Sequence, residues 1–241
     1  MRVVVPPFHR FQSVLASNVY LLDGGKGDRW LIDCGHWAER FQLLAELKRT
    51  GLSPRELTGV LLTHRHSDHA GNAEYLQREF GLKIYAHRAD AEVLEGAKQR
   101  YALARRGHFY ERALGLIENR WPSRVRVDGA LEHGQSIASL EVHWIPGHTE
   151  GSVFFRHAGT GCLLTGDTLL TPRPPLHLVL DVVPPYPAYS IDLRQAWEAI
   201  DRFHAQGFAY EHVLAGHGSP LVGNARQRVL RALAGRVRRR Y

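Results

Sequence analysis

The feature that most constrains this chain is a short apolar run that leads directly into a cluster of histidines. Residues 57–64 read LTGVLLTH, which is typical of a buried β-strand. The chain continues as RHSDHAGN, so that three histidines and one aspartate fall within six positions: His64, His66, Asp68 and His69. Imidazole and carboxylate groups are ligands for zinc or iron. The pattern predicts part of a metal site, with a solvated polar loop as the alternative.

The segments around this loop alternate between strand and helix patterns. Strand-like runs at 17–25 and 29–35 are separated by DGGKGD, a strong hairpin signal, and apolar residues at helical spacing follow at 38–51. A second helix is predicted at 70–81 and a further strand at 82–87. The order β-β-α-β-α-β predicts a layered α/β fold.

Residues 89–122 interrupt this alternation. They are helical in composition, rich in aromatic and basic residues, and too long for a simple connection between strands. We expect a helical insertion that covers a site. Its aromatic side chains would either form an apolar lid or anchor the helices to the rest of the domain. These side chains are Tyr101, Phe109, Tyr110 and Trp121.

The second half of the chain is rich in strand patterns with glycine-containing turns. A proline-rich loop at 171–190 and an amphipathic helix at 191–207 precede a last strand at 210–218. We therefore expect one domain over 1–241, with two β-rich halves that face each other. The other strands of the second half are predicted at 123–131, 138–147, 151–159 and 161–170.

Three more polar residues follow predicted strands, and each comes directly after a glycine. They are His148 in IPGHTEGS, Asp167 in LLTGDTLL and His217 in VLAGHGSP. Glycine lets the backbone turn sharply and approach a ligand closely. With the loop at 64–69, the chain has five histidines and two aspartates at strand ends, which indicates two neighbouring metal ions.

These motifs resemble the metallo-β-lactamase fold superfamily of metallo-hydrolases, over nearly the whole chain from LIDCG at 31–35 to AGHG at 215–218. The resemblance implies a four-layer αββα sandwich with the site at one edge, between two sheets. It also implies that Asp33 supports the histidine loop. The implied ligands are His64, His66 and His148 for one metal, Asp68, His69 and His217 for the other, and Asp167 as the bridge between both.

The resemblance further implies a hydrolase with two divalent metal ions, of which Zn²⁺ is the first choice and Fe or Mn are alternatives. A metal-bridging hydroxide would attack an ester, thioester or lactone-type carbonyl, and Asp68 would relay a proton. PGHTEGS and LLTGDTLL are most similar to the glyoxalase II-like branch, which hydrolyses thioesters. Tyr189, or its neighbour Tyr186, is a candidate hydrogen-bond donor to a substrate oxyanion, with loop packing as the alternative.

Other functions remain open from the sequence. The first alternative is a persulfide dioxygenase, an enzyme of this fold that uses a single iron and a glutathione persulfide. A nuclease that cleaves RNA or other phosphodiesters is favoured by the arginine-rich end of the chain. A metal-stabilised binding protein without activity is the third alternative, although the intact set of seven ligands argues against it.

The net charge of +7 resides at the C-terminal end, since the last 16 residues hold seven arginines and no acidic residue. We expect a basic C-terminal helix at 225–241 and a small-molecule substrate rather than a nucleic acid. No apolar run approaches the ~18–20 residues that span a bilayer, and the first residues lack a signal-peptide pattern. These features predict a cytoplasmic protein with no membrane partner. The oligomeric state is open, with a homodimer as one alternative.

Overall fold

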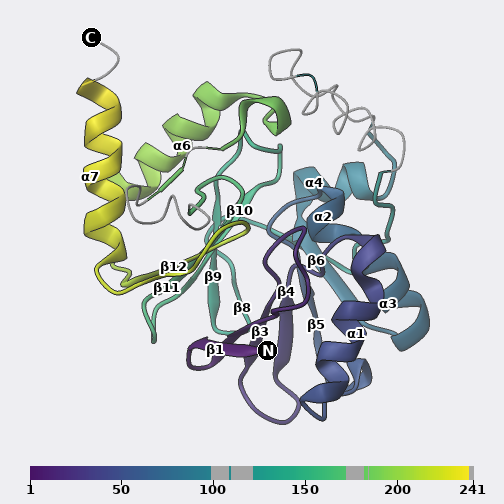
Figure 1. Cartoon of the computed structure of the whole chain (residues 1–241). Coiled ribbons are helices and arrows are strands. Elements are labelled where there is room, and N and C mark those ends of the chain that lie inside the picture. The colour runs from purple at the N-terminus through teal and green to yellow at the C-terminus, as the bar shows by residue number, and fades with distance from the viewer. Residues whose placement is uncertain (99–108, 110–121, 172–181, 184, 239–241) are drawn as a thin grey trace.

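The computed structural model describes residues 1–98, 109, 122–171, 182–183 and 185–238. Within them, two β-sheets pack face to face, and helices cover the outer face of each sheet (Figure 1). The helices α1 (Arg40–Arg49) and α3 (Ala73–Phe80) lie on one side, and α6 (Leu193–Ala205) and α7 (Ala225–Arg238) lie on the other. The predicted αββα sandwich is therefore confirmed.

The described part of the first sheet has seven strands in chain order. Neighbouring strands are antiparallel from β1 to β4 and parallel from β4 to β7. Parallel strands place their carboxyl ends at one edge, so the loops after β4 and β5 lie side by side. The strands are β1 (Arg2–Val5), β2 (Phe8–Arg10), β3 (Tyr20–Asp23), β4 (Arg29–Ile32), β5 (Gly59–Leu61), β6 (Lys83–His87) and β7 (Gly129–Leu131).

The second sheet has the described strand order β13-β12-β11-β10-β9-β8. Its strands β11 and β12 are parallel, and their carboxyl ends again share one edge. The strands are β8 (Ser136–Ile137), β9 (Leu140–Trp144), β10 (Val153–His157), β11 (Cys162–Gly166), β12 (His212–Ala215) and β13 (Leu221–Val222). The short helical segments are η1 (Trp37–Glu39), η2 (Pro54–Glu56), α2 (Ser67–Ala70), α4 (Arg88–Leu94) and η4 (Pro187–Tyr189).

Three hydrophobic clusters fill the spaces between the four layers. Strand β10 shows how the sequence supplies two of them, because successive side chains of a strand point to opposite faces. Phe155 packs between the two sheets, whereas Phe154 packs against α6 and α7. In β5, Leu61 joins the cluster between the sheets and Val60 joins the one under α1 and α3. Strands buried on both faces explain the continuous apolar runs of the sequence.

The structure differs from the sequence-based expectations in parts of the first sheet. The β1–β2 hairpin was not predicted, because Pro6 and Pro7 interrupt its strand pattern. The strand expected at 123–131 is limited to β7. Within the insertion expected at 89–122, the structure describes residues 89–98, Phe109 and Pro122. Phe109 is 87% exposed, and the other proposed lid residues, Tyr101, Tyr110 and Trp121, lie outside the described residues.

The basic C-terminal segment forms α7 through Arg238, and residues 239–241 lie outside the described residues. Across the described ranges, we find no helix with the combination of length and apolarity that a bilayer crossing requires.

Candidate metal centre

Asp33 organises the histidine loop from the neighbouring strand. It follows β4, and its carboxylate accepts hydrogen bonds from the Thr63 backbone N–H (2.8 Å) and the Thr63 hydroxyl (2.8 Å). Its Oδ2 atom also lies 2.7 Å from Nδ1 of His69. Because the Thr63 hydroxyl donates to Asp33, it accepts from Nδ1 of His64, at 3.1 Å. Asp33 thus orients two imidazoles so that their Nε2 atoms point away from it.

The first group of candidate ligands consists of His64, His66 and His148, whose ligand atoms lie within 4.8 Å of one another. Nε2 of His148 is 3.1 Å from Nδ1 of His66. The Ser190 hydroxyl donates to the Tyr186 carbonyl and so accepts from Nδ1 of His148, which leaves the lone pair of His148 on Nε2. Burial lowers the pKa of His148 to about 4 and that of His64 well below its usual value. These rings are therefore neutral, as metal ligation requires.

The second group contains two carboxylates and two imidazoles: Asp68, His69, Asp167 and His217. Nε2 of His217 lies 3.2 Å from Asp68 Oδ2 and 3.1 Å from Asp167 Oδ2, and Nε2 of His69 lies 3.2 Å from Asp167 Oδ1. Burial favours the neutral ring of His217, but Asp167 and Asp68 outweigh it and raise its pKa to about 9. The two carboxylates thus favour a cation at these imidazoles, either a proton or a metal ion that replaces it.

Asp167 lies between the two groups. Its Oδ2 atom is 3.1 Å from Nε2 of His217 and 3.8 Å from Nε2 of His148. The donor set fits divalent metal ions, because imidazole nitrogens and carboxylates converge in a buried place. Nε2 of His64 supports this fit, since it is buried and has no hydrogen-bond partner among the described residues. All seven sequence-predicted ligands are thus brought together in two adjoining groups.

Gly216, before His217, allows the two sheets to approach at the site. A Cβ atom at this position would lie 2.3 Å from Asp167 Oδ1 and 2.7 Å from Cε1 of His69. Both distances are shorter than side-chain carbon contacts in proteins. The glycine is therefore required by the close approach of Asp167 and His69.

We expect Gly216→Ala to displace Asp167 or His69 and to lower the number of metal ions bound per chain. Activity should fall about 10- to 100-fold, which is the range found when residues that support metal ligands are changed. Gly235→Ala is the matched control, because its Cβ meets nothing within 4 Å. Metal quantification on both purified variants checks this. An unchanged metal content in Gly216→Ala would contradict the tight packing of this turn.

Sequence analysis missed a buried carboxylate, Asp90 in the first turn of α4, that joins two ligand loops. Its Oδ2 atom accepts from the Arg65 backbone N–H (2.9 Å) and the Thr149 hydroxyl (2.8 Å), and its Oδ1 atom accepts from the Gly151 N–H (2.9 Å). The Arg65 guanidinium lies 3.6 Å from Asp90 and pairs with Glu150 at 2.9 Å. Asp90 thereby fixes the loop of His64 and His66 relative to the loop of His148.

The proposed oxyanion donor, Tyr189, lies in η4, with its ring 6.4 Å from that of the half-exposed Tyr186. Its role stays a prediction. The next residue, Ser190, contacts His148, and sequence analysis did not single it out.

Comparison with known proteins agrees with this fold. The family model of the metallo-beta-lactamase superfamily matches residues 13–206. The "Probable metallo-hydrolase YybB" of Bacillus subtilis is 28% identical over 177 residues, which cover 73% of this chain and 69% of that protein. A hydroxyacylglutathione hydrolase of Anaeromyxobacter dehalogenans is 32% identical over 150 residues, covering 62% of this chain and 45% of that enzyme.

A solved structure extends the similarity to almost the entire chain. The crystal structure of a metallo-beta-lactamase family protein from Thermus thermophilus superimposes with a TM-score of 0.68 and 26% sequence identity. The match covers 98% of this chain and 81% of that protein. The chain therefore belongs to the metallo-β-lactamase superfamily.

Proposed function

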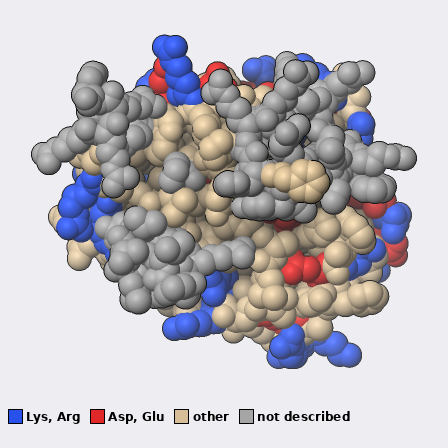
Figure 2. All heavy atoms as spheres, turned by 45° about the horizontal axis from the view of Figure 1, so that its top comes forward, with Lys and Arg blue, Asp and Glu red and all other residues tan. Residues whose placement is uncertain are grey.

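We propose that the protein is a dinuclear metal-dependent hydrolase that acts on an ester, thioester or lactone-type carbonyl of a small molecule. The observation that carries the proposal is the position of Asp167, whose carboxylate contacts histidines of both ligand groups. The similarity to a hydroxyacylglutathione hydrolase supports a thioester among the substrates. In Figure 2, most of the described Lys and Arg side chains that can be seen lie near the margin of the view.

His64, His66 and His148 would hold one ion, Asp68, His69 and His217 the other, and Asp167 would contact both. When bound, two divalent ions, with Zn²⁺ as the first choice, lower the pKa of water and polarise a carbonyl oxygen. Asp33 and Ser190 fix the tautomers of the histidines that they contact.

Among the carboxylates of the site, Asp68 is the one best placed to exchange protons with solvent. Its side chain is 30% exposed, compared with 8% for Asp167 and 3% for Asp33. Its Oδ2 atom would accept the proton released by the attacking water and pass it to the leaving group. The Ser17 hydroxyl donates to the Asp68 carbonyl at 2.5 Å and holds this residue in place.

Metal quantification combined with a panel of aryl ester, thioester, lactone and phosphodiester substrates tests this function. We expect two ions per chain, and carboxylic ester or thioester hydrolysis that stops with a chelator and returns with Zn²⁺. One iron per chain with oxygen consumption would instead indicate a dioxygenase, and hydrolysis of phosphodiesters alone would indicate a nuclease. A metal-loaded protein that is inactive on every substrate class would favour the binding-protein alternative.

A further inference from the structure

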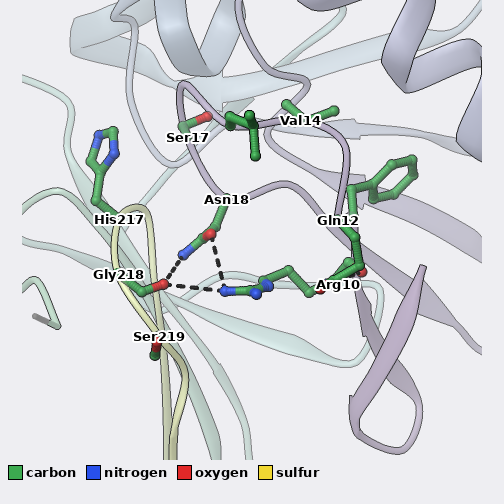
Figure 3. A pocket seen from close by; sticks show the side chains of 10 residues that line it. Arg10, Gln12, Val14, Ser17, Asn18, His217, Gly218 and Ser219 are labelled. Atoms are coloured by element: carbon green, nitrogen blue, oxygen red, sulfur yellow. Dashed lines mark hydrogen bonds between the residues drawn. The ribbon is translucent and has the colours of Figure 1, made fainter. Parts of the chain in front are cut away.

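A cavity of about 470 Å³ opens next to the second ligand group. Its lining comes from the end of β2, from the loop that follows it and from the turn that begins at His217 (Figure 3). His217 is thus shared by the cavity and the ligand cluster. A molecule in the cavity would contact a residue of the second ligand group.

Hydrogen bonds connect the walls of this cavity to both ligand loops. The Asn18 side chain donates to the carbonyls of Ala215 and Gly218, each at 2.9 Å, and its backbone N–H donates to Gly216 at 2.6 Å. The preceding residue, Ser17, contacts the backbone of Asp68. The cavity is therefore held in a fixed position relative to Asp68 and His217.

Arg10 is the permanent charge in the described lining, which contains no aspartate or glutamate. Its guanidinium reaches across from β2, and Nη1 donates to the Gly218 carbonyl (3.3 Å) and to Asn18 Oδ1 (3.5 Å), as Figure 3 shows. Among the described residues, both of its hydrogen bonds leave from Nη1 and go to neutral oxygens. Nε and Nη2 thus retain donors, in the geometry that binds a carboxylate or phosphate.

Two nearby carboxylates accept hydrogen bonds from backbone N–H groups and are not part of the cavity lining. Glu46 accepts from the backbone N–H groups of Gln12 (2.8 Å) and Ser13 (2.9 Å), and Glu39 accepts from that of Leu15 (2.7 Å). They fix the 12–16 segment without neutralising Arg10. Val14 and Leu15 add apolar side chains to the same lining.

We propose that this cavity binds the anionic end, a carboxylate or a phosphate, of a short acyl substrate through Arg10. Methylene groups would pack along Val14 and Leu15, and the scissile carbonyl would lie at the ligand cluster. The reaction in this proposal rests on the proposed function, whereas the binding of the anion does not.

Calorimetric titration of the metal-loaded protein with succinate and butyrate tests the binding. Both four-carbon acids carry one carboxylate that a metal centre can bind, but only succinate carries a second. We expect succinate to bind about 10- to 100-fold more tightly than butyrate, as a charge-assisted pair with arginine provides. Arg10→Gln should reduce this ratio to about threefold or less, and Arg10→Lys should retain part of it, because lysine keeps the charge but lacks the bidentate geometry.

Arg202→Ala is the charge-matched control, since this exposed arginine lies on α6, outside the cavity lining. It should leave the ratio of the two affinities unchanged. The compound 3-phosphonopropionate, which replaces one carboxylate of succinate by a phosphonate, distinguishes the two anions. If 3-phosphonopropionate binds more tightly than succinate and Arg10→Gln removes this advantage, the substrate bears a phosphate. If it binds more weakly than succinate, the substrate is a dicarboxylate.

Equal affinities for succinate and butyrate would overturn the proposal. So would an Arg10→Gln variant that weakens both acids equally, because Arg10 would then only support the Gly218 turn. If the protein hydrolyses no ester or thioester, the proposed function fails while these affinities still decide the anion site. If it does, a hemisuccinate ester should show a lower KM than the matching butyrate ester, and Arg10→Gln should remove that difference.

Discussion

We expect Asp167→Ala to lower metal-dependent kcat/KM by at least about 100-fold and to reduce the number of metal ions bound per chain. The reason is that Asp167 contacts both ligand groups, so that its loss affects two ions at once. Disturbing residues that merely support metal ligands costs about 10- to 100-fold in affinity or activity, and the loss of a ligand costs more. Steady-state kinetics and metal quantification on the same preparation measure both effects.

His66→Ala provides the parallel test for the first group, because His66 contacts His148 and lies outside the second group. We expect a similar loss of turnover with the fold retained, as checked by circular dichroism. His133→Ala is the control, since His133 is exposed and belongs to neither group. Wild-type activity in Asp167→Ala or in His66→Ala would show that the residue concerned is not a ligand.

The position of the site could be predicted because its residues follow strands. Asp33 comes directly after β4, His64 follows β5, Asp167 follows β11 and His217 follows β12. Parallel pairing of β4 with β5 and of β11 with β12 brings these strand ends to common edges. Apolar runs ending in polar residues thus indicated the candidate ligands, whereas the role of Asp33 and the division of the ligands between two ions came from the family resemblance.

The supporting contacts could not be predicted in the same way. Asp90 contacts Arg65 and Thr149, which are 25 and 59 positions away, and no local pattern encodes such pairings. Ser190 reaches His148 from a proline-rich segment that has no regular period. Arg10 belongs to a hairpin whose strand pattern is interrupted by two prolines. These residues act through tertiary geometry, which only the assembled sheets reveal.

The largest effect on stability is expected at Asp90. In Asp90→Ala, Arg65 keeps its ion pair with Glu150, but three buried donors lose their acceptor, which at ~1–3 kcal/mol each amounts to about 3–5 kcal/mol in total. These donors are the N–H groups of Arg65 and Gly151 and the Thr149 hydroxyl. We expect the free energy of unfolding, measured in urea at pH 7, to fall by about that amount. A change below ~1 kcal/mol would show that Asp90 does not hold these loops together.

The same residue should make stability depend on pH. Burial raises the pKa of Asp90 to about 6, although Arg65 opposes the shift. An unfolded aspartate has a pKa of about 3.9, so the folded protein binds this proton more tightly. The resulting stabilisation is complete below about pH 4 and is lost as the pH rises through about 6, by up to ~3 kcal/mol.

Asp90→Asn isolates this contribution, because the amide does not titrate and all other titrating side chains are shared with the wild type. Urea unfolding of both proteins at pH 4, 5, 6 and 7 should show the wild type losing stability relative to Asp90→Asn across this range. Since the histidine ligands titrate in both proteins, their contribution cancels in the difference. Two stability curves that run parallel from pH 4 to pH 7 would mean that Asp90 is ionised throughout, and that the Arg65 guanidinium and the three hydrogen bonds outweigh its burial.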